Sequence, residues 1–197
     1  GDGVPEIAIS ANVDDGLANP PYPGYVKVFS GGTGQLMYTL NGEHVFDFFG
    51  CEIDNAKDID GDGFDDLIVG ARKYITGTPA HAGKIYIYSG TTGSLILSQE
   101  GFAANDDFGY SCAGIGDVNL DGVNDFAVGA RLNDDGAADA GKIYVFSGLN
   151  GAIIRSHNGL AFHDHLGNGV CGLGDIDGDG VPDYIGGATE NAVGGYK

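Results

Sequence analysis

The chain has 197 residues and a net charge of −19, from 28 acidic and nine basic side chains. Such an acidic chain is not expected to bind nucleic acid or anionic membranes. Its 37 glycines follow no Gly-X-Y period, and it has no tryptophan. The glycines stand at turns between short apolar runs, which predicts an all-β fold. No run reaches the roughly 18 apolar residues of a membrane span, so we expect no membrane insertion in this segment.

Residues 1–42 form an incomplete first copy of a repeated unit. Its parts are GDGVPEIAISA at 1–11, an alternating strand GYVKVFSG at 24–31, a GTG turn at 32–34 and a strand QLMYTL at 35–40. Asp2 and Glu6 stand where the later copies have the end of an acidic loop. The first ligand positions of that loop are missing, so we expect no ion in this copy.

The unit recurs at 43–101, at 102–159 and, in part, at 160–197. Each copy opens with an apolar residue followed by glycine, and an aspartate lies three residues before that glycine. A short strand, an acidic loop and a strand ending in Gly-Ala follow, and then a variable polar loop. The opening pairs are Phe49-Gly50, Phe108-Gly109 and Leu166-Gly167, and the preceding aspartates are Asp47, Asp106 and Asp164.

The third strand of each complete unit, GKIYIYSG at 83–90 and GKIYVFSG at 141–148, is apolar or aromatic on both faces. Both faces are therefore expected to be covered. A Gly-containing turn and a fourth strand complete the unit. Four short antiparallel strands that repeat about every 59 residues are typical of a β-propeller blade. We expect about three and a quarter blades of a larger propeller: three strands of one blade, two full blades and the first two strands of a fourth.

The acidic loops begin at Asp58, Asp117 and Asp175, which are 117 − 58 = 59 and 175 − 117 = 58 residues apart. Carboxylates alternate with other residues in each loop, and like charges this close repel unless a cation neutralises them. Ca²⁺ prefers six to eight oxygen ligands on a tightly folded loop, and glycines permit the turns that such a loop needs. A helix-flanked calcium loop with an acid at position 12 is excluded, because that position is Val69, Val128 or Gly186.

Three cysteines, Cys51, Cys112 and Cys171, precede the acidic loops. Their number is odd and no C-x-x-C pair occurs, so we expect buried apolar residues rather than a zinc site; the sequence leaves their redox state open. His163 and His165 flank Asp164 and form either a metal or pH-sensitive site or ordinary loop positions.

The in-phase Phe-Gly, D-x-D-x-D-G-x-x-D and Gly-Ala motifs resemble the FG-GAP repeats of the integrin α-subunit β-propeller. The resemblance covers essentially the whole chain. It implies a seven-bladed propeller of about 400 residues, so the further blades would come from the same or another chain. It also implies Ca²⁺ loops between the first and second strands of a blade, and a ligand-binding face on the opposite side.

The resemblance implies metal ligands at loop positions 1, 3, 5, 7 and 9, with position 7 acting through its backbone carbonyl. Asn119 and Leu120 replace an acid and a glycine in the second loop, so we expect weaker binding there and two to three ions in all. The ligands are Asp58, Asp60, Asp62, Phe64 and Asp66; Asp117, Asn119, Asp121, Val123 and Asp125; and Asp175, Asp177, Asp179, Val181 and Asp183.

The sequence thus predicts a calcium-binding, integrin-like propeller module for extracellular adhesion, protein interaction or surface assembly, with structural ions and no catalytic role. A protein or glycan ligand would bind the face opposite the Ca²⁺ loops. The alternatives are a lectin-like propeller, which the ten tyrosines leave open, and a non-catalytic accessory propeller of a larger secreted enzyme.

Overall fold

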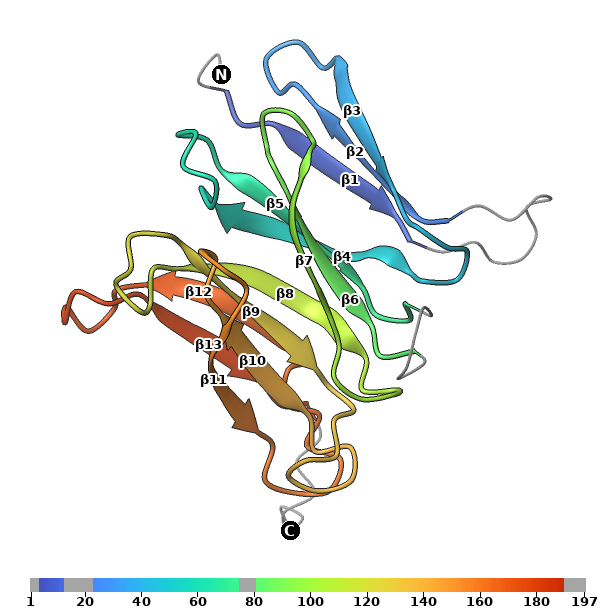
Figure 1. Ribbon diagram of the computed structural model, residues 1–197, viewed down its shortest axis with the longest axis vertical. Coiled ribbons are helices and arrows are strands. Elements are labelled where there is room, and N and C mark those ends of the chain that lie inside the picture. The colour runs from blue at the N-terminus through green and yellow to red at the C-terminus, as the bar shows by residue number, and fades with distance from the viewer. Residues whose placement is uncertain (1–3, 13–22, 75–80, 190–197) are drawn as a thin grey trace, which may run out of the picture.

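The computed structural model describes residues 4–12, 23–74 and 81–189, and in these residues all regular structure is β. Antiparallel sheets follow one another along the molecule (Figure 1). The first sheet has the order β1-β2-β3, and the last consists of β12 and β13. The strands of these two sheets are β1 (Ile7–Ala11), β2 (Tyr25–Phe29), β3 (Leu36–Asn41), β12 (Gly169–Gly174) and β13 (Asp183–Gly187).

Between them lie two four-stranded sheets with the orders β4-β5-β6-β7 and β8-β9-β10-β11. The predicted fold class, a run of antiparallel propeller blades, is confirmed. The limits of the four blade parts stay predictions. The strands of the two complete sheets are β4 (Phe49–Lys57), β5 (Asp66–Ala71), β6 (Lys84–Tyr88) and β7 (Leu95–Glu100), then β8 (Phe108–Gly116), β9 (Asp125–Ala130), β10 (Lys142–Phe146) and β11 (Ile153–Asn158).

The first strands of successive sheets pack side by side, so β8 lies between β4 and β12. The Phe-Gly and Gly-Ala motifs meet at these junctions. A Cβ on Gly70 would lie 2.3 Å from the carbonyl oxygen of Gly109, and a Cβ on Gly129 would lie 2.1 Å from that of Gly167. Any side chain at Gly70 or Gly129 would therefore push neighbouring sheets apart, which explains why the motif needs glycine there.

The core lies between the sheets. Both faces of β6 and β10 are covered, as predicted: Ile85, Ile87 and Tyr86 are buried in one, and Ile143 and Phe146 in the other. Their rings and branched side chains pack against the neighbouring sheets. A single sheet could not bury both of its faces by itself.

The expectation that all three cysteines are buried is wrong. Cys112 is buried in β8, Cys51 is half-buried and Cys171 is exposed in β12. All three are free thiols. Burial raises the pKa of Cys51 to about 11, so this group stays protonated at neutral pH. Cys171 is exposed because β12 and β13 form a two-stranded sheet in the described part of the chain.

The aspartate before each opening glycine has a structural role that the sequence left unassigned. Asp47, Asp106 and Asp164 are all buried. One carboxylate oxygen of Asp164 accepts hydrogen bonds from the backbone N–H groups of Leu160 and Ala161. Such side-chain caps fix the turn that leads into the first strand of a blade.

His163 and His165 are the flanking positions of the third of these turns. Both have positive φ angles, 59° and 53°, as do the residues in the matching positions of the other copies. Nε2 of His163 lies 3.1 Å from a carboxylate oxygen of Asp139, and the two imidazole rings stack. In the described residues, neither histidine belongs to a group of three or more His, Cys, Asp or Glu side chains that could hold a metal ion.

Candidate metal centres

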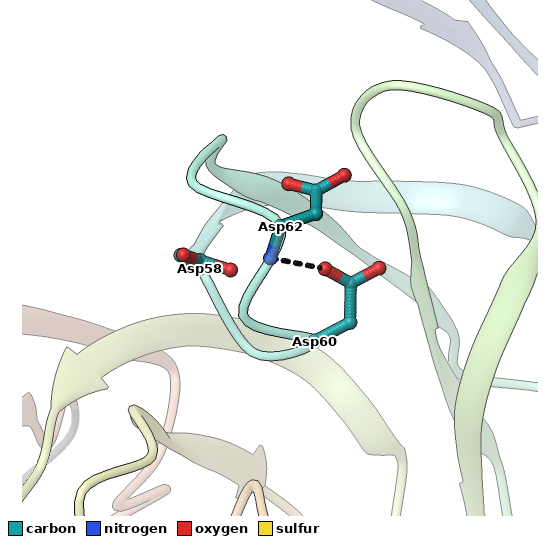
Figure 2. A group of neighbouring side chains, drawn as sticks. All are labelled: Asp58, Asp60 and Asp62. Carbon is teal, nitrogen blue, oxygen red and sulfur yellow. Dashed lines mark hydrogen bonds between the residues drawn. The ribbon is translucent and has the colours of Figure 1, made fainter.

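The first acidic loop joins β4 to β5. Ligand oxygens of Asp58, Asp60 and Asp62 all lie within 4.8 Å of one another, and Figure 2 shows the three carboxylates around the same turn. Two ligands at about 2.4 Å from a common Ca²⁺ are at most about 4.8 Å apart. The three predicted ligands therefore fit a Ca²⁺ ion.

Backbone amides hold this arrangement. The carboxylate of Asp58 accepts hydrogen bonds from the N–H groups of Gly61 and Gly63, at 2.7 and 3.0 Å. The N–H of Asp62 donates to Asp60 at 3.1 Å. Gly61 and Gly63 have φ angles of 78° and 88°, which a residue with a side chain adopts only at a cost. The alternation of Asp and Gly thus builds the turn as well as supplying its charges.

Asp66, the predicted ligand at position 9, is nearly buried, with 3% of its surface exposed. One of its oxygens accepts a hydrogen bond from Ile59 N at 2.8 Å, and the other from Gly90 N at 3.0 Å. Burial raises the pKa of Asp66, and the amide hydrogen bonds act in the opposite direction. The oxygen bonded to Ile59 also accepts a hydrogen bond from Asp60 N at 3.3 Å, so the oxygen bonded to Gly90 is the one with a second lone pair for an ion. Asp66 therefore joins the loop to the turn between β6 and β7.

The third loop joins β12 to β13, and here Asp175, Asp177 and Asp183 bring ligand oxygens within 4.8 Å of one another. Asp179 lies outside that group. Its carboxylate accepts a hydrogen bond from Val181 N at 2.8 Å, which holds position 5 to position 7. The oxygen donor set again fits Ca²⁺.

The second loop, between β8 and β9, is arranged differently. The amide of Asn119 donates to Asp121 at 2.9 Å, so a hydrogen-bond donor points at a carboxylate where the first loop has another acid. This hydrogen bond lowers the pKa of Asp121. Leu120 has a φ of 60° in the place of Gly61. Asp125 is fully buried and accepts hydrogen bonds from Val118 N and Gly148 N.

The predicted ligands at position 7 contribute backbone atoms. The N–H groups of Phe64 and Val123 donate to the position-5 aspartates Asp62 and Asp121. The side chain of Phe64 is 45% exposed, whereas those of Val123 and Val181 pack against core clusters. Their carbonyl ligation stays a prediction. Asp2 of the truncated copy lies outside the described residues, and Glu6 is exposed.

Sequence reasoning missed the contacts between the first two acidic loops and the next turn of the same blade. The hydroxyl of Thr91 donates to Asp62 at 2.7 Å, and that of Ser147 donates to Asp121 at 3.2 Å. The turn therefore binds the loop through a hydroxyl as well as through the glycine N–H. The recurring Ser-Gly at the end of the third strand was the available signal for the contact of Ser147, whereas Thr91 follows the Ser89-Gly90 pair and does not recur, since Leu149 takes its place in the next blade.

The fold and these loops define a segment of a β-propeller built from repeats. The FG-GAP repeat model matches residues 52–88 and 108–146, and the chain belongs to this repeat family. In the described residues no helix is long and apolar enough to cross a membrane.

The curated relatives are integrin α chains. The chain is 32% identical to integrin alpha-5 of Xenopus laevis over 182 residues, which cover 84% of this chain and 17% of that one. It is 34% identical to human integrin alpha-11 over 166 residues, covering 78% and 14%. The chain thus spans about a sixth of the length of these relatives.

Among solved structures, a rhamnogalacturonan lyase of Bacillus licheniformis is similar, with a TM-score of 0.57 and 16% sequence identity. The match covers 95% of this chain and 38% of the lyase. At this identity the likeness extends to the fold alone.

Proposed function

We propose that this segment is a Ca²⁺-stabilised interaction module of a cell-surface or secreted protein. The observation that supports it best is the convergence of three carboxylates in both the first and the third loop, within the spacing that one Ca²⁺ can span. Similarity to integrin α chains supports adhesion or protein interaction as the purpose of such a module.

The ions would act structurally. Asp58, Asp60 and Asp62 would hold an ion in the first loop, together with the carbonyl of Phe64 and with Asp66. Bound Ca²⁺ supplies positive charge that cancels the repulsion among these carboxylates. The chain's own residues position the ligands. Backbone amides orient the carboxylates of the loop, and Asp66 connects the loop to the β6–β7 turn through its hydrogen bonds. A ligand set this complete leaves little open coordination for catalysis.

Extracellular Ca²⁺ is millimolar, which suits loops of the weaker, extracellular class with dissociation constants of about 10⁻⁴–10⁻³ M. A rigid propeller would then present the variable loops at the other end of the sheets to a protein partner. The lectin-like and accessory-propeller alternatives stay predictions.

The proposal is tested by counting bound ions and measuring adhesion together. Native mass spectrometry of Asp177→Ala, which removes one of the three converging carboxylates of the third loop, is expected to show one ion fewer than the wild-type chain, with the first loop still filled. Beads coated with the wild-type chain are expected to adhere to matrix proteins in Ca²⁺ and to detach in EDTA. Ion-free wild-type protein, or adhesion that EDTA leaves unchanged, would overturn the proposal.

A further inference from the structure

Three cationic side chains surround one buried carboxylate at the end of the sheets opposite the acidic loops. Lys73 Nζ lies 2.5 Å from Oδ1 of Asp107, while Arg131 Nε and Arg72 Nη1 lie 3.1 and 3.5 Å from its Oδ2. Arg72 and Lys73 directly follow β5, and Arg131 directly follows β9. The acidic loops precede these same two strands, at their opposite ends. We call this group the Asp107 cluster. It lies at the end of the sheets where the variable loops follow β5 and β9, which we call the loop-bearing face.

The cluster carries an excess of positive charge. Three of the chain's nine Lys and Arg residues are gathered here, in a protein of net charge −19. The carboxylate of Asp107, whose side chain is 1% exposed, balances one of the three charges. The three cations therefore outnumber the carboxylate that they contact, in a largely acidic molecule, and a cation cluster of this kind attracts anions over short range.

Much of the hydrogen-bonding capacity of the two guanidinium groups is unused. Among the described residues Arg131 contacts the carboxylate through Nε, and Arg72 contacts it through one Nη at the long distance of 3.5 Å. A guanidinium has five N–H donors in a planar fork that matches a carboxylate. The side chains of Arg72, Arg131 and Lys73 are 24%, 27% and 30% exposed, so an incoming group can reach them.

Aromatic rings hold the guanidinium groups in place. Cζ of Arg131 lies 4.0 Å from the ring centroid of Tyr110, and Cζ of Arg72 lies 5.4 Å from that ring and 4.7 Å from the ring of Phe48. These stacking contacts, together with Asp107, reduce the rotamer freedom that a ligand would otherwise have to remove. The donors are thus positioned before any ligand arrives.

We infer that the Asp107 cluster binds an acidic segment of a protein partner through its carboxylate groups. This inference rests on the proposed function and names the chemistry of the partner at the loop-bearing face. Carboxylate is favoured because the planar guanidinium fork pairs with it through two parallel hydrogen bonds. The negative charge of the surrounding protein limits the site to a short acidic stretch rather than a long polyanion.

The test measures binding of fluorescein-labelled octaglutamate by anisotropy, in excess Ca²⁺ and at low salt, with octaglutamine as the neutral peptide. Octaglutamate is expected to bind and octaglutamine is not. Arg131→Gln and Arg72→Gln are each expected to weaken binding by roughly tenfold, and raising the salt to about 0.15 M is expected to weaken it further.

Arg155→Gln is the matched control, because Arg155 is an exposed arginine on β11 that contacts Val118 O in the second acidic loop. It removes the same charge elsewhere and is expected to leave peptide binding unchanged. Melting temperatures show whether each variant folds. Lys73→Gln serves as a second variant if an arginine variant does not fold.

Absence of octaglutamate binding at low salt would overturn the inference, as would equal weakening by Arg155→Gln. Tighter binding of a heparin oligosaccharide than of octaglutamate would assign the site to a sulfated glycan instead and also overturn it. Any of these results, obtained while Ca²⁺ still binds and adhesion persists, would leave the proposed function intact.

Discussion

Two neighbouring residues, Asn119 and Leu120, distinguish the second acidic loop from the first and third. The amide of Asn119 donates to Asp121, where an acid would supply another negative oxygen. Leu120 adopts the left-handed conformation that glycine adopts in the first loop. Both substitutions reduce the fit of this loop for Ca²⁺, because affinity follows the number of charged ligands and the loop geometry.

Asn119→Asp is therefore expected to increase the Ca²⁺ affinity of the second loop by roughly tenfold, since a fourth carboxylate joins Asp117, Asp121 and Asp125. Isothermal titration calorimetry would resolve the change. Asn150→Asp, in an exposed turn, makes the same change of charge and is expected to leave the affinity unaltered. An equal gain in both variants would point to general electrostatics instead.

Leu120→Gly is expected to stabilise the ion-free chain by up to about 1 kcal/mol. Leu120 is 65% exposed, so little packing is lost, and removing its side chain relieves the positive φ. Urea unfolding measures the difference. Leu149 is similarly exposed at 60% but has no positive φ, so Leu149→Gly should bring no gain.

At the scale of elements, the buried aspartate that begins β5 connects three parts of one blade. Asp66 accepts hydrogen bonds from the acidic loop and from the β6–β7 turn, and Asp125 does the same in the next blade. These contacts are made in the ion-free chain, so the loop is organised before any ion binds.

Asp66→Ala is consequently expected to destabilise the chain by about 2–4 kcal/mol even in EDTA, because it leaves buried N–H groups without acceptors. Asp60→Ala removes the same charge from the same loop, but Asp60 is exposed and should matter little without Ca²⁺. Urea unfolding in EDTA compares the two variants. Equal losses would refute a structural role specific to Asp66.

Acidification is expected to stabilise the ion-free chain between about pH 7 and pH 5. Folding raises the pKa of four carboxyl groups and lowers the pKa of Glu43 and Asp121. Just above the usual carboxyl pKa the raised groups dominate, because the lowered ones are ionised in both states, so the folded chain binds more protons than the unfolded chain and stability rises as pH falls through that window. With Ca²⁺ bound the trend should reverse, because protons displace the ion. Melting curves at several pH values, with Ca²⁺ and with EDTA, test this. The groups are Glu52, Asp66, Asp106 and Asp125.

The repeat made the blades predictable. Apolar alternation in the third strand and the in-phase acidic loops were enough to place the strands and to bring Asp58, Asp60 and Asp62 together. Features that recur in every copy can be predicted from the sequence. The Asp107 cluster could not be predicted, because Phe48 and His165 occupy the matching positions in the other copies. Its contacts also join residues that are 24 to 35 positions apart.

The contacts between the acidic loops and the following turns of the same blades also could not be predicted from the sequence. Thr91 and Ser147 approach the acidic loops only when the third and fourth strands fold back along the second. Cys171 was mistaken for a buried residue because its burial depends on a neighbouring sheet and not on its own strand. Local pattern predicts elements, but it does not report which surfaces the next element covers.

For the whole molecule, the excess of negative charge makes stability depend on cations. The acidic loops concentrate carboxylates at one end of the sheets, and the Asp107 cluster gathers cations at the other. Bound Ca²⁺ would lower the repulsion at the first end and leave the second end available to an acidic partner.

The most direct measurement is the melting temperature of the chain in millimolar Ca²⁺ and in EDTA, with Mg²⁺ as the control for ionic strength. Two ions bound at about ten times their dissociation constants would add roughly 3 kcal/mol, which raises the melting temperature of a chain this size by about 6–12 °C. Mg²⁺ should give a smaller rise, because it retains its water and prefers a stricter geometry. An equal melting temperature in Ca²⁺ and EDTA would contradict a calcium-stabilised propeller.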